Sequence, residues 1–312
     1  MSKRCILLTS FFLFLAPVFL FSKQKKDWTF IVYIAADNDL NFFARRNIND
    51  MKRIGSNQFI NILVQLDGYG IHEKTKRFFI EKNAAVQVNS HDVTGFQKLN
   101  SGSAQTLISC CKWAIENYPA NHYALVLWNH GTGILDNVRG KAINASEAFV
   151  FNPNTHMLEL NRDIEFLHYI EEKYSKNIPR GVCFSDTYGS YLTNEKLFYA
   201  LETISTSFLN GKKIDILAFD ACLMSMIEVG GMVKDFVHIM VGSQEVELGT
   251  GWPYNLILEP FARTTLTPTA FAQHMIESYK TAYETVTNDF TQSAVLLDKI
   301  KLLGLKYLTH SG

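Results

Sequence analysis

The chain has 312 residues, of which 47% are hydrophobic and 19% are charged. This composition supports a large hydrophobic core and excludes global disorder and a coiled coil. The 30 basic and 30 acidic residues give zero formal net charge. The chain therefore lacks the positive field that nucleic-acid binding uses, and we expect no nucleic-acid partner.

The first residues have the pattern of an export segment. Lys3 and Arg4 precede an apolar run over residues 6–21, and the polar stretch KQKKD follows it. This pattern indicates a cleaved secretory signal over residues 1–22, or alternatively a membrane anchor over residues 5–22. We favour the cleaved signal. We therefore expect an exported protein, in the periplasm, in the cell envelope or secreted, that meets a membrane only through this segment if it stays uncleaved.

Residues 23–312 alternate short apolar runs with helical stretches. This alternation predicts one α/β domain, with a mostly parallel sheet between helices. The predicted strands cover residues 29–37, 59–67, 122–133, 214–222, 237–245 and 293–298, with a hairpin at 77–88. The predicted helices cover residues 40–55, 104–117, 162–174, 194–208, 224–236 and 268–286. Residues 134–156 are polar and rich in turns and predict an exposed loop, and residues 249–254 predict a further loop.

The cysteines after the export segment do not form a metal or disulfide pattern. Cys110, Cys111, Cys183 and Cys222 include no C-x-x-C pair and no spacing typical of zinc ligands. We expect no required cofactor and no metal site. Calcium binding stays open but is not indicated, because the sequence has no D-x-D-x-D-G loop.

Two residues that end apolar strands could carry nucleophilic chemistry. His130 follows YALVLW, and Cys222 follows IDILAFDA directly before a predicted helix. The carboxyl ends of neighbouring parallel strands meet at one edge, so an imidazole there could take the thiol proton, and the helix dipole would favour the thiolate. Gly131 leaves room for an N–H that faces an oxyanion. The alternative is a buried structural thiol and a histidine with ordinary partners.

Five segments in order resemble the clostripain family, cysteine peptidases of the caspase-like fold. They are WTFIVYIAADNDL, LVLWNHGTG, DTYGSYLTNEKLFYAL, IDILAFDACLMSMIEV and GSQEVELGTGWPY, and they extend from residue 28 to about residue 293. The resemblance implies a caspase-like α/β/α sandwich around a mostly parallel sheet. It also implies a catalytic dyad of Cys222 as nucleophile and His130 as general base and then acid. In the mechanism that we predict, backbone N–H groups at Gly131 and Cys222 hold the oxyanion.

The resemblance also implies cleavage after Arg or Lys, with Asp220 binding the basic side chain. Asp220 and Cys222 are two residues apart on one strand, so they face the same side. The alternative for Asp220 is a helix cap or a structural ion pair. After the next strand, Glu245 could supply a second acid and Trp252 a wall of the pocket, whereas Glu247 is predicted to be a solvated loop residue.

Two further segments are interpreted from local pattern. Arg139 and Lys141 lie in the 134–156 loop and could be sites of autocleavage, since family members cut themselves between the two motifs; the alternative is an uncut chain. Asp37-Asn38-Asp39 precedes a predicted helix, and we interpret it as a helix cap.

The function predicted from these features is an exported cysteine endopeptidase that acts on peptide or protein substrates with Arg or Lys at the cleavage site. The alternative is a non-catalytic envelope or surface protein that keeps the fold to bind a partner. The intact His130, Cys222 and Asp220 favour the enzyme.

Overall fold

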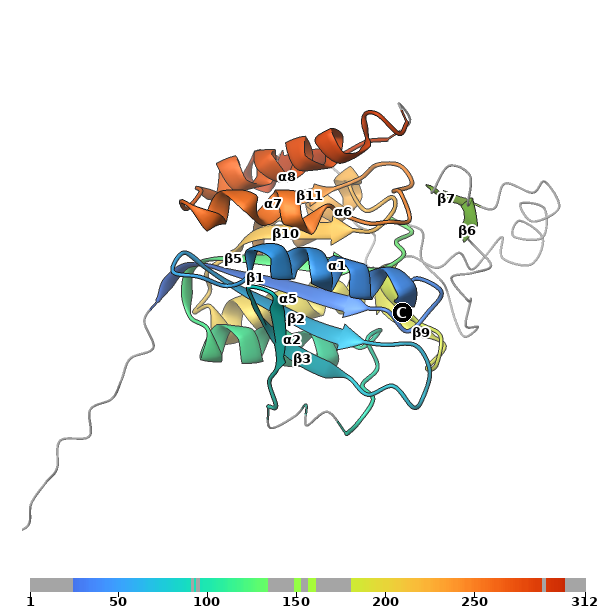
Figure 1. The fold of residues 1–312 in the computed structure, drawn as a ribbon. Coiled ribbons are helices and arrows are strands. Elements are labelled where there is room, and N and C mark those ends of the chain that lie inside the picture. Colours follow the sequence, from blue (N-terminus) through green and yellow to red (C-terminus); the bar gives the residue numbers. More distant parts are fainter. Residues whose placement is uncertain are drawn as a thin grey trace, which may run out of the picture.

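The structure is a computed structural model, and it describes residues 25–90, 93, 96–133, 149–152, 157–160, 181–287 and 290–300. The described chain folds as three layers, with helices on both faces of one large sheet (Figure 1). The fold is therefore the caspase-like α/β/α sandwich that the sequence predicts. The predicted signal over residues 1–22 and the predicted helix at 162–174 lie outside the described residues.

The sheet has eight strands in the order β12-β11-β10-β5-β1-β2-β3-β4. Five neighbouring strands are parallel, and β12, β3 and β4 are antiparallel to their neighbours. The bounds are β1 Lys26–Ala35, β2 Ile60–Asp67, β3 Lys76–Glu81, β4 Ala84–Gln87, β5 Ala120–Trp128, β10 Ile214–Asp220, β11 Val237–Gly242 and β12 Ser293–Leu296. The central strands read as continuous apolar runs because helices cover both of their faces.

The helices form two layers with separate apolar cores. In Figure 1, α1 lies in front of the strands and α2 and α5 lie behind them. One core joins the sheet to α1 (Asn41–Ile54), α7 (Tyr254–Leu258) and α8 (Pro268–Tyr283). The other joins it to α2 (Ala104–Asn117), α5 (Asn194–Phe208) and α6 (Ile227–Val233). Short 3₁₀ helices cover Glu259–Ala262 and Leu297–Lys299.

Some predicted elements differ from the structure. A two-stranded sheet of β6 (Phe149–Asn152) and β7 (Met157–Leu160) occupies the end of the predicted loop. A second hairpin, β8 (Gly181–Ser185) and β9 (Ser190–Thr193), was not predicted. Its strands are short and irregular, with Cys183 at a positive φ of 62°. Such strands carry too little periodicity to be recognised in a sequence.

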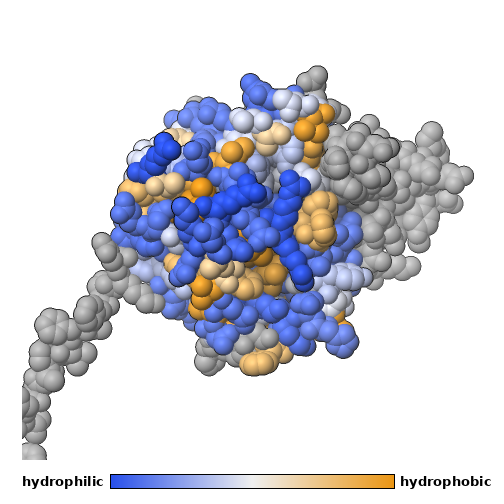
Figure 2. Space-filling model, viewed as in Figure 1, coloured by the Kyte–Doolittle hydropathy of each residue, from blue (hydrophilic) through white to orange (hydrophobic). Residues whose placement is uncertain are grey.

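The visible surface is mostly hydrophilic. Figure 2 shows strongly hydrophilic residues gathered in the middle of the face that carries α1, with apolar residues in small separate patches. In the part of the chain that the structure describes, no helix is long and apolar enough to span a membrane.

Candidate active site

His130 and Cys222 lie at the same rim of the sheet. β5 and β10 are parallel neighbours with Trp128 opposite Asp220, and the Asn129 N–H donates to the Asp220 carbonyl at 3.2 Å. His130 and Cys222 each follow this last pair by two residues. Cys222 packs in the core under α1, α7 and α8, and His130 contacts Asp39, which lies just before α1. Both side chains thus lie on the α1 side of the carboxyl edge.

Glycine at position 131 is required by close backbone packing. A Cβ there would lie 2.4 Å from the Cys222 carbonyl oxygen and 2.7 Å from Met224 Cγ. Gly131 also forms a β-bridge with Val182 of β8. Two strand-end segments therefore pack directly together, and any side chain at Gly131 would push Cys222 away. The assignment of Gly131 and Cys222 as oxyanion donors stays a prediction.

The Cys222 thiol is buried and uncharged in this structure. Its side chain is 1% exposed, and its Sγ accepts a hydrogen bond from the Glu247 N–H at 3.3 Å. Burial raises the pKa of the Cys222 thiol, and the nearby Glu247 carboxyl raises it further. The arrangement is a closed one, in which the buried thiol lies against the backbone at Glu247.

The prediction that a helix dipole favours the Cys222 thiolate is wrong. Cys222 lies in a turn, and α6 begins only at Ile227. Leu223 has a φ of 63°, and its N–H donates to the Glu245 carbonyl at 3.0 Å. The chain after Cys222 therefore runs along the segment that follows β11, and helix formation is delayed by five residues. A dipole acts only over the first turn of a helix, so it does not activate this thiol.

Asp220 is buried beside Cys222 and faces the α7 side. Its side chain accepts hydrogen bonds from the Tyr254 hydroxyl at 2.7 Å and from the Trp252 N–H at 3.3 Å. Burial raises the pKa of Asp220 to about 7, although these hydrogen bonds oppose the shift. No described lysine or arginine pairs with Asp220. The helix-capping alternative for Asp220 is not what the structure shows, since its partners are in the 252–254 segment.

Glu247 is the second acid of this region, and the expectation that it is solvated is wrong. Its side chain is 3% exposed, and its Oε1 accepts hydrogen bonds from Trp252 Nε1 at 3.2 Å and from Gln292. Burial raises the pKa of Glu247, as do the charge of Asp220 and a hydrogen bond to it. Glu245 is exposed. Residues 245 and 247 are both acidic loop residues in the sequence, and only folding decides which one is enclosed.

Trp252 is buried and forms a wall against both acids, through its backbone N–H to Asp220 and its indole N–H to Glu247. Gly251, with a φ of 71°, approaches Asp220 so closely that a Cβ would lie 3.3 Å from each carboxylate oxygen. The GTGWPY loop therefore encloses the acids tightly. The substrate-binding role of Asp220, Glu245 and Trp252 stays a prediction.

Asp39 is a site residue that the sequence analysis missed. Its Oδ1 lies 2.8 Å from His130 Nε2. The N-cap residue of α1 is Leu40, and the Asn38 side chain of the motif accepts from its N–H at 3.0 Å, whereas Asp39 contacts His130. Asp37 instead binds Ser185, Thr187 and Lys98. The motif follows β1 at the same edge of the sheet as His130, and that position was the available signal.

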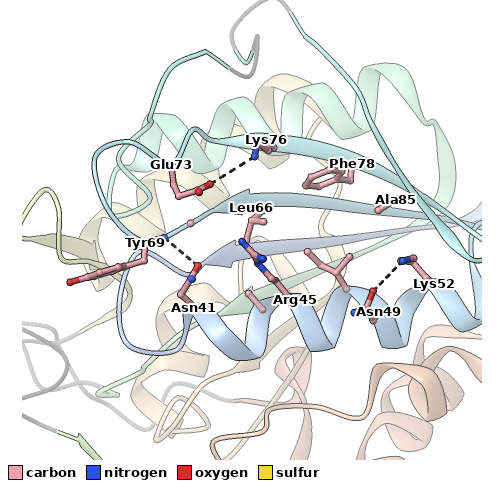
Figure 3. A pocket seen from close by; sticks show the side chains of 13 residues that line it. Asn41, Arg45, Asn49, Lys52, Leu66, Tyr69, Glu73, Lys76, Phe78 and Ala85 are labelled. Carbon is pink, nitrogen blue, oxygen red and sulfur yellow. Dashed lines mark hydrogen bonds and ion pairs between the residues drawn. The ribbon is translucent and has the colours of Figure 1, made fainter.

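The described cavity with a volume of ≈ 470 Å³ lies beside the candidate site and not over it. Figure 3 shows Asn41, Arg45 and Lys52 of α1 on one side and Leu66 and Phe78 of the sheet on the other. His130 and Cys222 do not line it. This groove is open, whereas the Cys222 thiol is buried and not reached from it.

Two further predictions concern autocleavage and metal binding. Arg139 and Lys141 lie outside the described residues, so autocleavage there stays a prediction. Within the described ranges, no cluster of three or more His, Cys, Asp or Glu side chains could hold a metal ion.

Comparisons with known proteins agree with this architecture. Clostripain from Hathewaya histolytica is 24% identical over 257 residues, which are 74% of this chain and 41% of that protein. The structure of a secreted C11 cysteine protease from Bacteroides thetaiotaomicron with an irreversible peptide inhibitor has a TM-score of 0.59 and 21% identity, covering 87% of this chain and 66% of that chain. An inactive zymogen C11 protease from Parabacteroides distasonis has a TM-score of 0.60 and 22% identity, covering 88% and 63%.

The chain thus spans less than two thirds of the length of each of these relatives. The two structural likenesses support the fold. The model of the clostripain family (Peptidase_C11) matches residues 32–161 and 168–308, which are most of the sequence. The chain therefore belongs to the clostripain family.

Proposed function

We propose that this chain is an exported cysteine endopeptidase that cleaves peptide bonds after Arg or Lys. Cys222 is the nucleophile, and His130 takes its proton and later protonates the leaving amine. Family membership supports the peptidase activity. The N-terminal pattern of residues 1–22 supports export, and the relative from Bacteroides thetaiotaomicron is described as secreted.

The observation that carries the specificity is the buried acid pair Asp220–Glu247 beside the thiol. Burial raises the pKa values of both carboxyls, because an ionised carboxylate enclosed without a described cation is costly. A guanidinium or ammonium group that enters this region would replace the missing cation. A charged partner in such a dry site is strongly favoured over a neutral side chain.

The closed geometry implies a rearrangement before catalysis. The Glu247 N–H donates a hydrogen bond to Cys222 Sγ, and the Tyr254 hydroxyl donates one to the Asp220 carboxylate. Both partners belong to the segment after β11. A shift of this segment would release the thiol toward His130 and free Asp220 for the substrate in the same movement. This coupling links substrate recognition to formation of the catalytic pair.

The test uses paired peptide reporters that differ only in Arg, Lys or a neutral residue before the scissile bond. We expect Cys222→Ala to lose activity by at least about 10⁴-fold, because the reaction has no other nucleophile. We expect Asp220→Asn to lose about 10²-fold in kcat/KM on the basic reporters and little on the neutral one, since it removes only the charge.

Asp215→Asn is the matched control, because Asp215 lies on the same strand and binds His122 and the Tyr123 N–H away from the thiol. Unchanged basic preference in Asp220→Asn would overturn the specificity proposal. Full activity in Cys222→Ala would overturn the peptidase mechanism itself. If the wild type cleaves no reporter but binds peptides ending in Arg, the chain is a binding protein with this fold.

A further inference from the structure

We propose that Asp39 is a positioning residue that holds the His130 imidazole with Nδ1 directed to the reaction and stabilises the imidazolium. The inference rests on the proposed function, because it extends the pair Cys222–His130 to a third group. Its basis is the 2.8 Å contact between Asp39 Oδ1 and His130 Nε2. The imidazole is fully buried, whereas the Asp39 side chain is 37% exposed.

The contact is made by a residue whose backbone is held on both sides. Directly before it, the Asn38 side chain donates to the Ala35 and Phe184 carbonyls and accepts from the Leu40 N–H. α1 begins two residues after it at Asn41. Asp39 therefore has little freedom to move away from His130, and a positioned partner needs this rigidity.

The carboxylate is ionised at neutral pH. Burial raises the pKa of Asp39, but the hydrogen bond and charge of His130 and nearby backbone N–H groups outweigh burial, so the net shift is downward. An ionised carboxylate only accepts hydrogen bonds. The facing Nε2 must therefore carry the hydrogen of the neutral imidazole, which leaves the lone pair on Nδ1.

This tautomer assigns the proton path. Nδ1 takes the proton from the Cys222 thiol as the sulfur bonds to the substrate carbonyl carbon, and the carbonyl electron pair moves to the oxygen. The imidazolium then keeps its Nε2–H on Asp39. When the C–N bond breaks, the leaving amine takes the proton from Nδ1, and the ring returns to its starting tautomer. Asp39 gains no proton in this sequence.

The test compares Asp39→Asn and Asp39→Ala with the control Asp235→Asn, whose carboxyl is exposed and pairs with Lys234. We expect kcat to fall by about 10²-fold in both Asp39 variants with KM nearly unchanged, because the change affects the proton transfers and not substrate binding. The control should match the wild type.

A second measurement does not depend on turnover. In ¹⁵N-histidine-labelled protein, with the His130 signals assigned by loss in His130→Gln, the wild type should show the Nε2–H tautomer. Asp39→Ala should show a mixture of tautomers. Wild-type kcat in both Asp39 variants, together with the wild-type tautomer in Asp39→Ala, would overturn the inference while Cys222-dependent cleavage stays intact. Cleavage that persists in Cys222→Ala would instead mark failure of the proposed function.

Discussion

Two pairs of buried acids lie along the same edge of the sheet, and they differ in whether a cation accompanies them. Asp37 and Asp67, at the ends of β1 and β2, share the Lys98 ammonium at 3.2 and 2.8 Å. Asp220 and Glu247, near β10 and β11, share only neutral donors among the described residues. Within the described part of the chain, the first pair has a cation and the second pair has none.

The two pairs also differ in the pKa values of their carboxyl groups. Burial raises the pKa of Asp37, but Ser185, Gly70, Thr187 and Lys98 outweigh it and lower the pKa overall. For Asp67, burial outweighs Lys98 and the pKa is raised. In the second pair both values are raised. A complete acid cluster stabilises a fold, whereas an incomplete one beside a nucleophile is a place for a cationic ligand.

The largest effect is expected from removing the cation of the first pair. Lys98→Met leaves two buried carboxylates without their ammonium and should lower the free energy of unfolding by about 3–5 kcal/mol. Urea unfolding at neutral pH measures it. Lys82→Met, at an exposed lysine, is the control and should stay within about 0.5 kcal/mol of the wild type. Equal stability of Lys98→Met and wild type would mean that the first pair does not need its cation.

A second effect is expected from the pH dependence of the second pair. With its pKa raised to about 7, folded Asp220 keeps a proton that the unfolded chain has lost. The stability from this group is present below the unfolded pKa of about 4 and is lost as pH rises through about 7, with a slope of about 1.4 kcal/mol per pH unit. Thermal unfolding of wild type should therefore weaken over this window relative to Asp220→Asn. Parallel curves for the two proteins would show that Asp220 ionises normally.

The smallest effect is expected from deleting one neutral donor of the first pair. The Thr187 hydroxyl donates to Asp37 at 2.7 Å, while Ser185 and two backbone N–H groups continue to bind that carboxylate in Thr187→Val. We expect a loss of about 1 kcal/mol. Thr206→Val on α5, where the hydroxyl binds only carbonyls of its own helix, controls for the change of side chain. A loss as large as that of Lys98→Met would mean that the hydroxyl, and not the ammonium, holds this cluster.

Much of the architecture could be predicted from the sequence, because apolar runs such as those of β1, β5 and β10 need cover on both faces. The same logic placed His130 and Cys222 at one edge. It failed at Asp39, which was interpreted from its neighbour in sequence, the helix, although its partner is 91 residues away. It failed at Glu247 because an acid in a loop is normally exposed.

The sequence by itself determined the layers, the order of the main elements and the membership of the family, since periodicity and motifs are local and survive without coordinates. Only the tertiary structure decided which acid is enclosed beside Cys222, which nitrogen of His130 meets a carboxylate, and that the thiol is closed off by the Glu247 N–H. Burial and hydrogen-bond geometry depend on contacts between segments far apart in the chain, so no local sequence pattern predicts them.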